Sequence, residues 1–486
     1  MLWASVAGRC STRGSRAILD PSAPLVFIIR MLGHNGDAVG RSWRKDRPRV
    51  LLITLDRVAK QMAGPAIRCW ELGHLLSEHA DVTLAAADMG SIASDRIELV
   101  SFIAHSPGAI RRHIAEADVI IAQPQWSVVA TWMHRSRARV IYDLYDPETL
   151  ETLETFAERA TLERYMRLEL TLDRLQDALR GGHHFMCASE KQRDLWIGAM
   201  YGQRLIGPTL YDRDPSFRSV IDVVPFGLPQ EPPPAPTSSV IRAAFPAIAP
   251  EDEIVLWNGG IWNWLDPACA VRAFAHLRDR RPRARLVFMG AGTMAAAKDA
   301  STRAREAAID AGLLDQTVFF NHEWVPYHER SAWLQDAECA VATHLEHLET
   351  RFAFRTRMLD CFWAGLPPVC TEGDDLSERV RRDGLGEAVA PGDDLALAAA
   401  LERVLERGRA FYADALVEVA HEYAWTRVAQ PLVNFVMDDR PSRSLGGNAR
   451  GPWRRESTHQ ARFVAYQLGH HALHKAFSAR RRLLGR

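Results

Sequence analysis

The sequence has no surplus of charge, because 60 lysine and arginine residues match 60 aspartate and glutamate residues. Dedicated binding of nucleic acid needs a basic excess to hold the phosphates, so this class of function is excluded. The balance is uneven along the chain, since residues 440–486 hold eleven basic residues and a single acid, Glu456. This basic tail is therefore predicted to be a separate segment.

Cysteine pairs and long apolar runs are also missing. The seven cysteines are widely spaced without a Cys-x-x-Cys motif, which favours reduced core residues of a cytoplasmic protein over a disulfide or zinc framework. No run approaches the ~18 to 20 apolar residues that span a bilayer. Asp20 and Pro21 interrupt the only apolar stretch near the N-terminus, so a signal peptide is not predicted. Residues 1–47 are an extension of unknown role, in which Met31 is a second candidate start.

What the chain does contain is typical of a globular protein, with 47% hydrophobic and 25% charged residues. Its 486 residues suggest two domains. Short buried strands alternate with helical stretches, which predicts an α/β fold with parallel sheets and helices on both faces. The predicted strands are 50–55, 82–86, 117–122, 139–143, 184–188 and 221–225 in the first half, and 254–258, 285–290, 317–321, 339–343 and 368–371 in the second.

A proline-rich stretch, residues 230–239, separates the two halves and is predicted to be a hinge. We therefore predict two doubly wound, Rossmann-like domains, 48–229 and 240–439. Open α/β sheets bind ligands at the carboxyl ends of their strands, so the chemistry is expected in a cleft between the domains.

Glycine-rich turns follow two strands of the second half. Gly259 and Gly260 precede a predicted helix start that Asp266 is placed to cap, and such a turn lets a phosphate approach backbone N–H groups. A tight turn with packed tryptophans explains these glycines equally well. The motif at Gly290 resembles a dinucleotide fingerprint but has only two glycines and no acid about twenty residues later, so a nicotinamide cofactor is rejected.

The most informative segment runs from His344 to Thr371. A predicted strand leads into a polar loop with Glu349 and Arg351, and a helix is expected from about Arg355 to Ala364, with Asp360 inside it. Arginine at a helix start can neutralise a diphosphate, and a carboxylate can bind hydroxyls. The alternative is a solvated salt-bridge cluster, but the coincidence of a sheet edge, a helix start and both charges favours a functional site.

Residues 360–369 resemble the Glu-Ala-Met-Ala-Cys-Gly-Leu-Pro-Val-Val stretch of the family four, or group 1, glycosyltransferases. These are retaining enzymes of GT-B fold that use nucleotide sugars. The resemblance covers about 48–435, and its looser matches are residues 64–72, 143–147, 187–196, 224–227 and 321–326.

The resemblance implies roles for several residues. Asp360 occupies the position of the second of two family glutamates, which binds the ribose hydroxyls. Trp324 and Val325 would meet the base, and Gly64 would lie beside the phosphates. Gly259 and Gly260 are further donor-binding candidates, and the candidate catalytic residues are Glu349, Arg355 and Asp360.

The sequence also departs from the family in its donor half. The first family glutamate, which contacts the donor sugar, is replaced by Phe352, and Glu349 is the candidate substitute. The family's arginine and lysine for the diphosphate are missing from residues 259–266, so Arg355 or Arg351 is expected to compensate.

A further departure concerns the acceptor half. The histidine that often follows the fourth strand in the family is absent from residues 122–126, which leaves Gln123 or Gln125 as sugar contacts. His344 is another acceptor or sugar candidate, as a loop residue near the cleft or on the surface.

No metal or other cofactor is expected. Asp212 and Asp214 match the aspartate pair of other glycosyltransferases only superficially, because they lie in a loop of the first domain that is more consistent with an exposed turn. His344 and His347 have metal-like spacing but no further ligand set.

We therefore predict a transferase that moves a sugar from a nucleotide donor to an acceptor with retention of configuration. The expected acceptor is a growing cell-surface polysaccharide or its lipid carrier. The tail has aromatic and apolar residues at helical spacing, which predicts an amphipathic helix on the inner face of an anionic membrane. A disordered tail, or a helix docked on the body, is the alternative.

Two rival functions stay open. A sugar-nucleotide epimerase of similar fold would bind the same donor but need no acceptor. A catalytically degenerate GT-B protein that binds a glycan or a partner is suggested by Phe352 and by the missing arginine and lysine.

Overall fold

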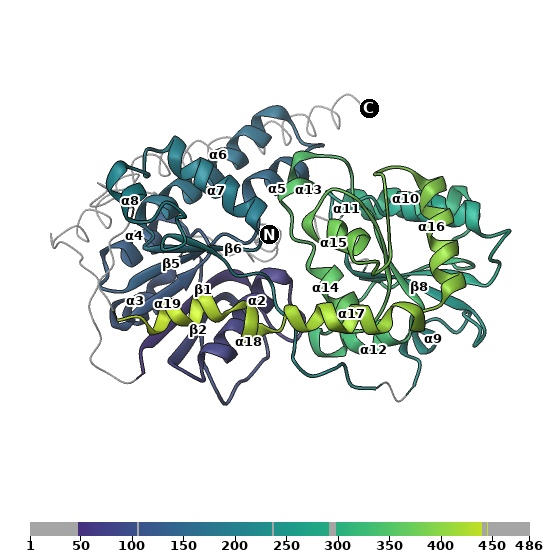
Figure 1. Ribbon diagram of the computed structural model, residues 1–486, viewed down its shortest axis with the longest axis horizontal. Coiled ribbons are helices and arrows are strands. Elements are labelled where there is room, and N and C mark those ends of the chain that lie inside the picture. Colours follow the sequence, from purple (N-terminus) through teal and green to yellow (C-terminus); the bar gives the residue numbers. More distant parts are fainter. Residues whose placement is uncertain (1–46, 105, 236–237, 291–297, 440–444, 446–486) are drawn as a thin grey trace, which may run out of the picture.

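The computed structural model describes residues 47–104, 106–235, 238–290, 298–439 and 445. Two parallel sheets, each covered by helices, form two lobes that lie side by side (Figure 1). The predicted α/β class with two doubly wound domains is confirmed. The N-terminal extension and the basic tail beyond Leu445 lie outside the described residues, as does Cys10.

The first lobe contains a seven-stranded sheet in the order β3-β2-β1-β4-β5-β6-β7. Val50 in β1 pairs with Val82 in β2 and Val119 in β4, so the strand order reverses at β1, the position where such sheets bind ligands. The strands are β1 (Arg49–Val58), β2 (Asp81–Met89), β3 (Glu98–Ser101), β4 (Val119–Ala122), β5 (Arg139–Asp143), β6 (His184–Cys187) and β7 (Ile221–Val223). The helices are α2 (Gly64–Leu76), α3 (Arg111–Glu116), α4 (Ser127–Arg135), α5 (Glu148–Thr155), α6 (Thr161–Gly181), α7 (Glu190–Gly202) and α8 (Pro208–Arg213).

The second lobe contains a six-stranded sheet in the order β10-β9-β8-β11-β12-β13. Its strands are β8 (Glu253–Gly260), β9 (Ala284–Gly290), β10 (Val318–Phe320), β11 (Cys339–Ala342), β12 (Pro368–Thr371) and β13 (Glu387–Val389). Its helices are α9 (Val240–Ala244), α10 (Pro267–Leu277), α11 (Lys298–Asp310), α12 (Arg330–Gln335), α13 (Leu348–Phe352), α14 (Thr356–Trp363), α15 (Asp375–Arg382) and α16 (Asp394–Arg407). As predicted, Asp266 caps α10, because its side chain accepts a hydrogen bond from Cys269 N.

The last helices connect the lobes a second time. α17 (Ala410–Glu422) packs on α14, whereas α18 (Trp425–Val428) and α19 (Gln430–Met437) lie against the first lobe (Figure 1). Trp425 N donates to Leu228 O at 3.0 Å, and Arg139 Nη2 donates to Phe435 O at 2.8 Å. The helices α18 and α19, which fall within the predicted second domain 240–439, therefore pack on the first lobe.

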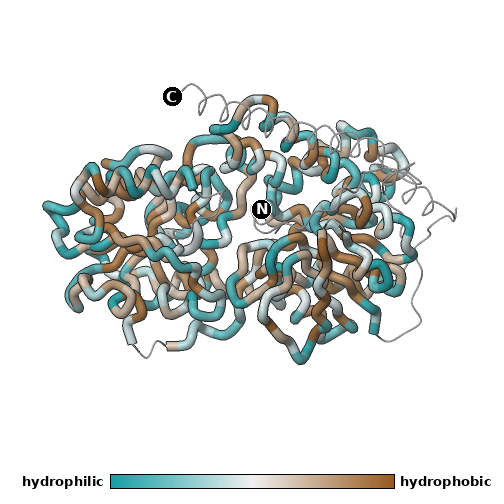
Figure 2. The backbone as a smooth tube through the Cα atoms, turned by 180° about the vertical axis from the view of Figure 1, so that it is seen from behind, coloured by the Kyte–Doolittle hydropathy of each residue, from teal (hydrophilic) through white to brown (hydrophobic). Residues whose placement is uncertain are grey.

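The apolar residues fill the interior of both lobes, where the strands are most hydrophobic (Figure 2). The cysteines of the described part are free and buried, as predicted for reduced core residues. None of the helices in the described ranges combines the length and the apolar character that crossing a bilayer requires.

Candidate active site

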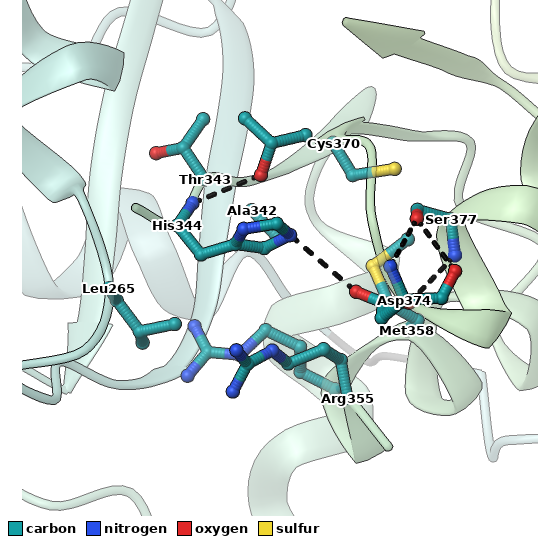
Figure 3. A pocket seen from close by; sticks show the side chains of 11 residues that line it. Leu265, Ala342, Thr343, His344, Arg355, Met358, Cys370, Asp374 and Ser377 are labelled. Carbon is teal, nitrogen blue, oxygen red and sulfur yellow. Dashed lines mark hydrogen bonds and ion pairs between the residues drawn. The ribbon is translucent and has the colours of Figure 1, made fainter. Parts of the chain in front are cut away.

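The candidate site lies at the carboxyl edge of the second sheet, where β8, β11 and β12 end. After β11 the chain forms the short helix α13 and then begins α14 at Thr356, next to the glycine turn that ends β8. A cavity of about 10 Å³ lies here, with room for about one water molecule. Arg355 and His344 reach into it from opposite sides (Figure 3). Its lining comprises Leu265, Ala342, Thr343, His344, Arg355, Arg357, Met358, Cys370, Thr371, Asp374 and Ser377.

Glu349 and Arg355 form a buried ion pair with two hydrogen bonds. Arg355 Nη1 lies 2.9 Å from Glu349 Oε1, and Nη2 lies 2.6 Å from Oε2. The Glu349 side chain is 0% exposed and that of Arg355 is 10% exposed. Burial opposes the charge of Arg355, but the Glu349 carboxylate outweighs it, so the pKa of Arg355 is raised. Two candidate residues thus contact one another, and Glu349 is positioned to neutralise Arg355.

Arg357 is a half-buried cation whose Nη1 atom is buried, and it has no acidic partner among the described residues. Its Nη2 donates to Gly260 O at 2.8 Å, and its guanidinium carbon lies 5.3 Å from the ring centroid of Trp257. A Cβ atom at Gly259 would lie 3.9 Å from the same carbon, so the side chain packs beneath the glycine turn. Burial, and then the charge of Arg355, lower the pKa of Arg357 to about 9. An anion placed over this turn would stabilise the charged form.

Three buried nitrogen atoms of the cavity wall have no hydrogen-bond partner within the described part of the chain. They are His344 Nε2, Arg355 Nε and Arg357 Nη1. His344 Nε2 lies 3.6 Å from Asp374 Oδ2, which is longer than a hydrogen bond. Buried polar groups in proteins almost always have partners, so a wall with three unpaired nitrogens indicates a place for water or an anion.

Asp360 lies on α14, three residues after Arg357. Its Oδ1 accepts a hydrogen bond from Arg330 Nε at 3.1 Å, and its side chain is 29% exposed. The carboxylate is therefore fixed through one oxygen while the residue remains accessible to solvent.

The candidates near the base pack around the glycine turn. Gln61 of the first lobe donates to Trp324 O at 2.8 Å, and the Trp324 ring would lie 3.4 Å from a Cβ atom at Gly260. The ring centroids of Trp324 and Trp262 are 6.2 Å apart, and Val325 is buried. The sequence left two explanations for Gly259 and Gly260, a phosphate site or a turn with packed tryptophans. The packed tryptophans are present, and Arg357, which would attract a phosphate, lies under the same turn.

The first-lobe candidates have different surroundings. A Cβ atom at Gly64 would lie 2.9 Å from the Tyr145 hydroxyl, so only glycine fits at this start of α2. Gln123 Oε1 accepts a long hydrogen bond of 3.4 Å from Thr54. Gln125 is 1% exposed and donates to Gln123 O, so the structure places it in the interior of the lobe.

The remaining candidates of the donor half are not brought into the cavity wall. Arg351 is exposed, with its guanidinium 5.7 Å from the Phe352 ring centroid. The carbonyl of Phe352 accepts a hydrogen bond from Gln192 of the first lobe at 2.8 Å. His344 is buried in the cavity wall, which removes the surface position that was one of its two predicted placements, whereas His347 is half-buried and its side chain caps α13.

Within the described ranges, no group of three or more His, Cys, Asp or Glu side chains is placed to hold a metal ion. Asp214 instead accepts hydrogen bonds from Ser216 and Ser219, two and five residues further on, after the end of α8. Asp212 and Arg213 are the last residues of α8, so the predicted loop begins only at Asp214, while the expected exposure of Asp212 is confirmed.

Three carboxyl groups of the first lobe were not singled out by the sequence. Asp56 follows the core of β1, Asp146 follows β5, and Glu151 lies on α5, which packs against α13. Burial is the main reason that their pKa values are raised, to about 6 for Asp56, to about 8 for Asp146 and well above the usual value for Glu151. Both shifts favour the protonated form, in which a carboxyl group can donate a hydrogen bond to a hydroxyl-rich molecule.

Comparison with known proteins supports the resemblance. Residues 252–407 match the family described as "Glycosyl transferases group 1", so the predicted resemblance is confirmed for the second lobe. No curated protein matches the sequence.

Several solved structures share the fold. The structure of Anabaena Alr3699/HepE in complex with UDP-glucose is 13% identical, with a TM-score of 0.59, and the match covers 80% of this chain and 99% of that one. WaaG, a glycosyltransferase involved in lipopolysaccharide biosynthesis, is 15% identical, with a TM-score of 0.56 and coverage of 80% and 99%. Sucrose-phosphate synthase from Thermosynechococcus elongatus is 15% identical, with a TM-score of 0.57 and coverage of 80% and 98%. The predicted GT-B architecture is thereby confirmed.

Proposed function

We propose that this chain, whose second lobe is a group 1 glycosyl transferase domain, transfers a sugar from a nucleotide-sugar donor to an acceptor hydroxyl. The observation that carries the proposal is Arg357, a half-buried cation without an acidic partner in the described ranges, whose buried Nη1 has no hydrogen-bond partner there and which lies under the Gly259–Gly260 turn. A buried, uncompensated charge is costly, and a bound diphosphate would compensate it.

The leaving nucleoside diphosphate gains negative charge as the bond to the sugar breaks. Fixed cations and helix N–H groups that face this charge stabilise the transition state more than the ground state. Arg357 lies in the first turn of α14, two residues after Arg355, whose charge is paired with Glu349, and no side chain caps that helix. The cavity holds only about 10 Å³, so the phosphates are proposed to lie over the turn and not inside the cavity.

The other parts of the substrates have candidate contacts. Asp360 is proposed to bind the ribose hydroxyls and Trp324 to contact the base. The carboxyl groups of Asp146 and Glu151, whose pKa values are raised, are proposed to bind acceptor hydroxyls from the first lobe. Retention of configuration, and a cell-surface glycan or its lipid carrier as acceptor, are proposed from the family resemblance.

A panel of nucleotide sugars tests this function against its rivals. Release of nucleoside diphosphate supports transfer, and an isomerised donor supports an epimerase instead. If the protein binds a donor without any turnover, a degenerate binding protein is the better description.

Replacing Asp360 by asparagine is expected to raise the KM for the donor at least tenfold, about 1.4 kcal/mol, because the ribose loses a charged hydrogen-bond acceptor. Steady-state kinetics with saturating acceptor would measure the change. Asp279→Asn is the matched control, since the Asp279 side chain is 92% exposed and lies just after the C-terminal end of α10. A KM equal to that of the wild type would remove Asp360 from the donor site.

The basic tail is proposed to attach the enzyme to the inner face of an anionic membrane. Deleting residues 446–486 keeps Leu445, whose N–H donates to Gly182 O at 3.2 Å, and is expected to leave donor binding unchanged. Cosedimentation with vesicles containing phosphatidylglycerol should fall severalfold, because each basic residue near such a surface contributes about 1 kcal/mol. Equal cosedimentation of both proteins would discard the membrane role.

A further inference from the structure

The two lobes touch where the loop after β1 meets the segment before α12. Tyr327 N donates to Lys60 O at 3.0 Å, and Gln61 Nε2 donates to Trp324 O at 2.8 Å. The Tyr327 hydroxyl also faces the carboxylate of Glu71 on α2, and each group shifts the pKa of the other. Residues 324–327 are thus held to the first lobe by two hydrogen bonds, with Tyr327 beside Glu71.

Arg330, at the start of α12, lies directly on this contact. Its guanidinium carbon is 3.8 Å from the ring centroid of Tyr327 and 4.8 Å from that of Trp363, and its Nη1 donates to Tyr327 O at 2.9 Å. The side chain is 11% exposed. A guanidinium held against two rings and a carbonyl has little freedom to rotate, so its direction follows the position of Tyr327.

The remaining hydrogen bond of this guanidinium goes to the candidate ribose ligand. Arg330 Nε donates to Asp360 Oδ1 at 3.1 Å. Asp360 is one methylene shorter than the glutamate of the family motif, so the direction of its carboxylate decides whether it can reach a ribose. A displacement of about 1 Å at such a contact costs up to about 100-fold in rate.

We propose that Arg330 is a positioning residue that directs Asp360 toward the donor ribose, and that the contact between Glu71 and Tyr327 links this direction to the position of the first lobe. The inference rests on the proposed function, because the ribose contact of Asp360 is part of it. Neither Glu71 nor Tyr327 needs to touch the donor. Loss of their contact weakens recognition of the nucleoside and leaves recognition of the phosphates unchanged.

The test compares two ligands on the full chain. Wild-type protein is first titrated calorimetrically with UDP, GDP and ADP, and the tightest binder is kept as the nucleoside probe; pyrophosphate, which lacks ribose, is the second probe. Tyr327→Phe removes the hydroxyl and keeps the ring under Arg330. Glu71→Gln removes the negative charge of the second residue in this contact. Each variant is expected to bind the nucleoside diphosphate three- to tenfold more weakly and to bind pyrophosphate as the wild type does.

The double variant adds a second criterion. If Glu71 and Tyr327 act through one contact, Glu71→Gln combined with Tyr327→Phe is expected to weaken binding no more than the stronger single change. Tyr201→Phe is the control, because Tyr201, near the end of α7, is 72% exposed.

Each other result has a defined meaning. Variants that bind the nucleoside diphosphate like the wild type overturn the inference, and so does an equal loss for both probes, which would indicate general damage. A wild-type protein that binds none of the three nucleotides contradicts the proposed function itself, and the inference with it.

Discussion

Replacing Arg357 by glutamine is expected to lower kcat/KM for the nucleotide-sugar donor by about 100-fold while leaving the protein as stable as the wild type, or more stable. The loss follows from removing a fixed positive charge beside the developing diphosphate, an effect worth about 3 kcal/mol in comparable sites. The stability result follows from burial, because Arg357 has no acidic partner within the described residues and its charged form is disfavoured there. Residues kept for function often carry such a cost.

Two measurements on the same samples check this expectation. Kinetics with a donor found in the panel give the catalytic effect, and thermal unfolding with and without nucleoside diphosphate gives the stability and the ligand response. Arg351→Gln is the matched control, because Arg351 is exposed six residues earlier and lies outside the cavity wall. A normal kcat/KM together with a lower melting temperature would show that Arg357 supports the fold and not the reaction.

Replacing Glu349 by alanine is expected to lower the free energy of unfolding by about 3 kcal/mol. The change leaves the buried guanidinium of Arg355 without its carboxylate, and uncompensated buried charges cost 3 to 5 kcal/mol in comparable cases. Urea unfolding measures the difference.

The same experiment decides between two roles for Glu349. Replacing both Glu349 and Arg355 by methionine should recover much of the lost stability, since no buried charge then remains. Glu372→Ala is a control from the partly exposed pair with Arg381 and should change stability by less than about 1 kcal/mol. If Glu349→Ala unfolds like the wild type but loses affinity for the donor sugar, Glu349 is the sugar contact predicted from the sequence.

The buried parallel strands were predictable because each is a continuous apolar run. Two strands were missed, β3 (Glu98–Ser101) and β13 (Glu387–Val389), and both are short edge strands with half-exposed residues. An edge strand has one neighbour and one open side, so its sequence need not be apolar throughout. The helix α13 was missed for a related reason, since it has only five residues in a segment expected to be a loop.

The candidate site could be located from the sequence, but the ion pair between Glu349 and Arg355 could not be predicted. The helix start at Arg355 and the acid at Asp360 follow from local spacing, and α14 confirms the helix that was expected there. The ion pair of Glu349 with Arg355 depends on how α13 folds back toward α14, which is a tertiary contact. Arg357 was overlooked because a charge near Asp360 on a short helix is normally solvated. The position of the β8 turn above it covers part of this arginine, including Nη1, and this packing is a tertiary contact.

The two covalent passages between the lobes restrict how this molecule can move. The polypeptide passes once through the proline-rich stretch and returns near Ala424, where Trp425 N donates to Leu228 O. The two connecting segments lie next to each other and together define a hinge axis. They restrict rotation of one lobe in other directions, so we expect the lobes to rotate about this axis. Shortened proteins that stop before Trp425 would lose the second passage together with part of the first lobe's covering.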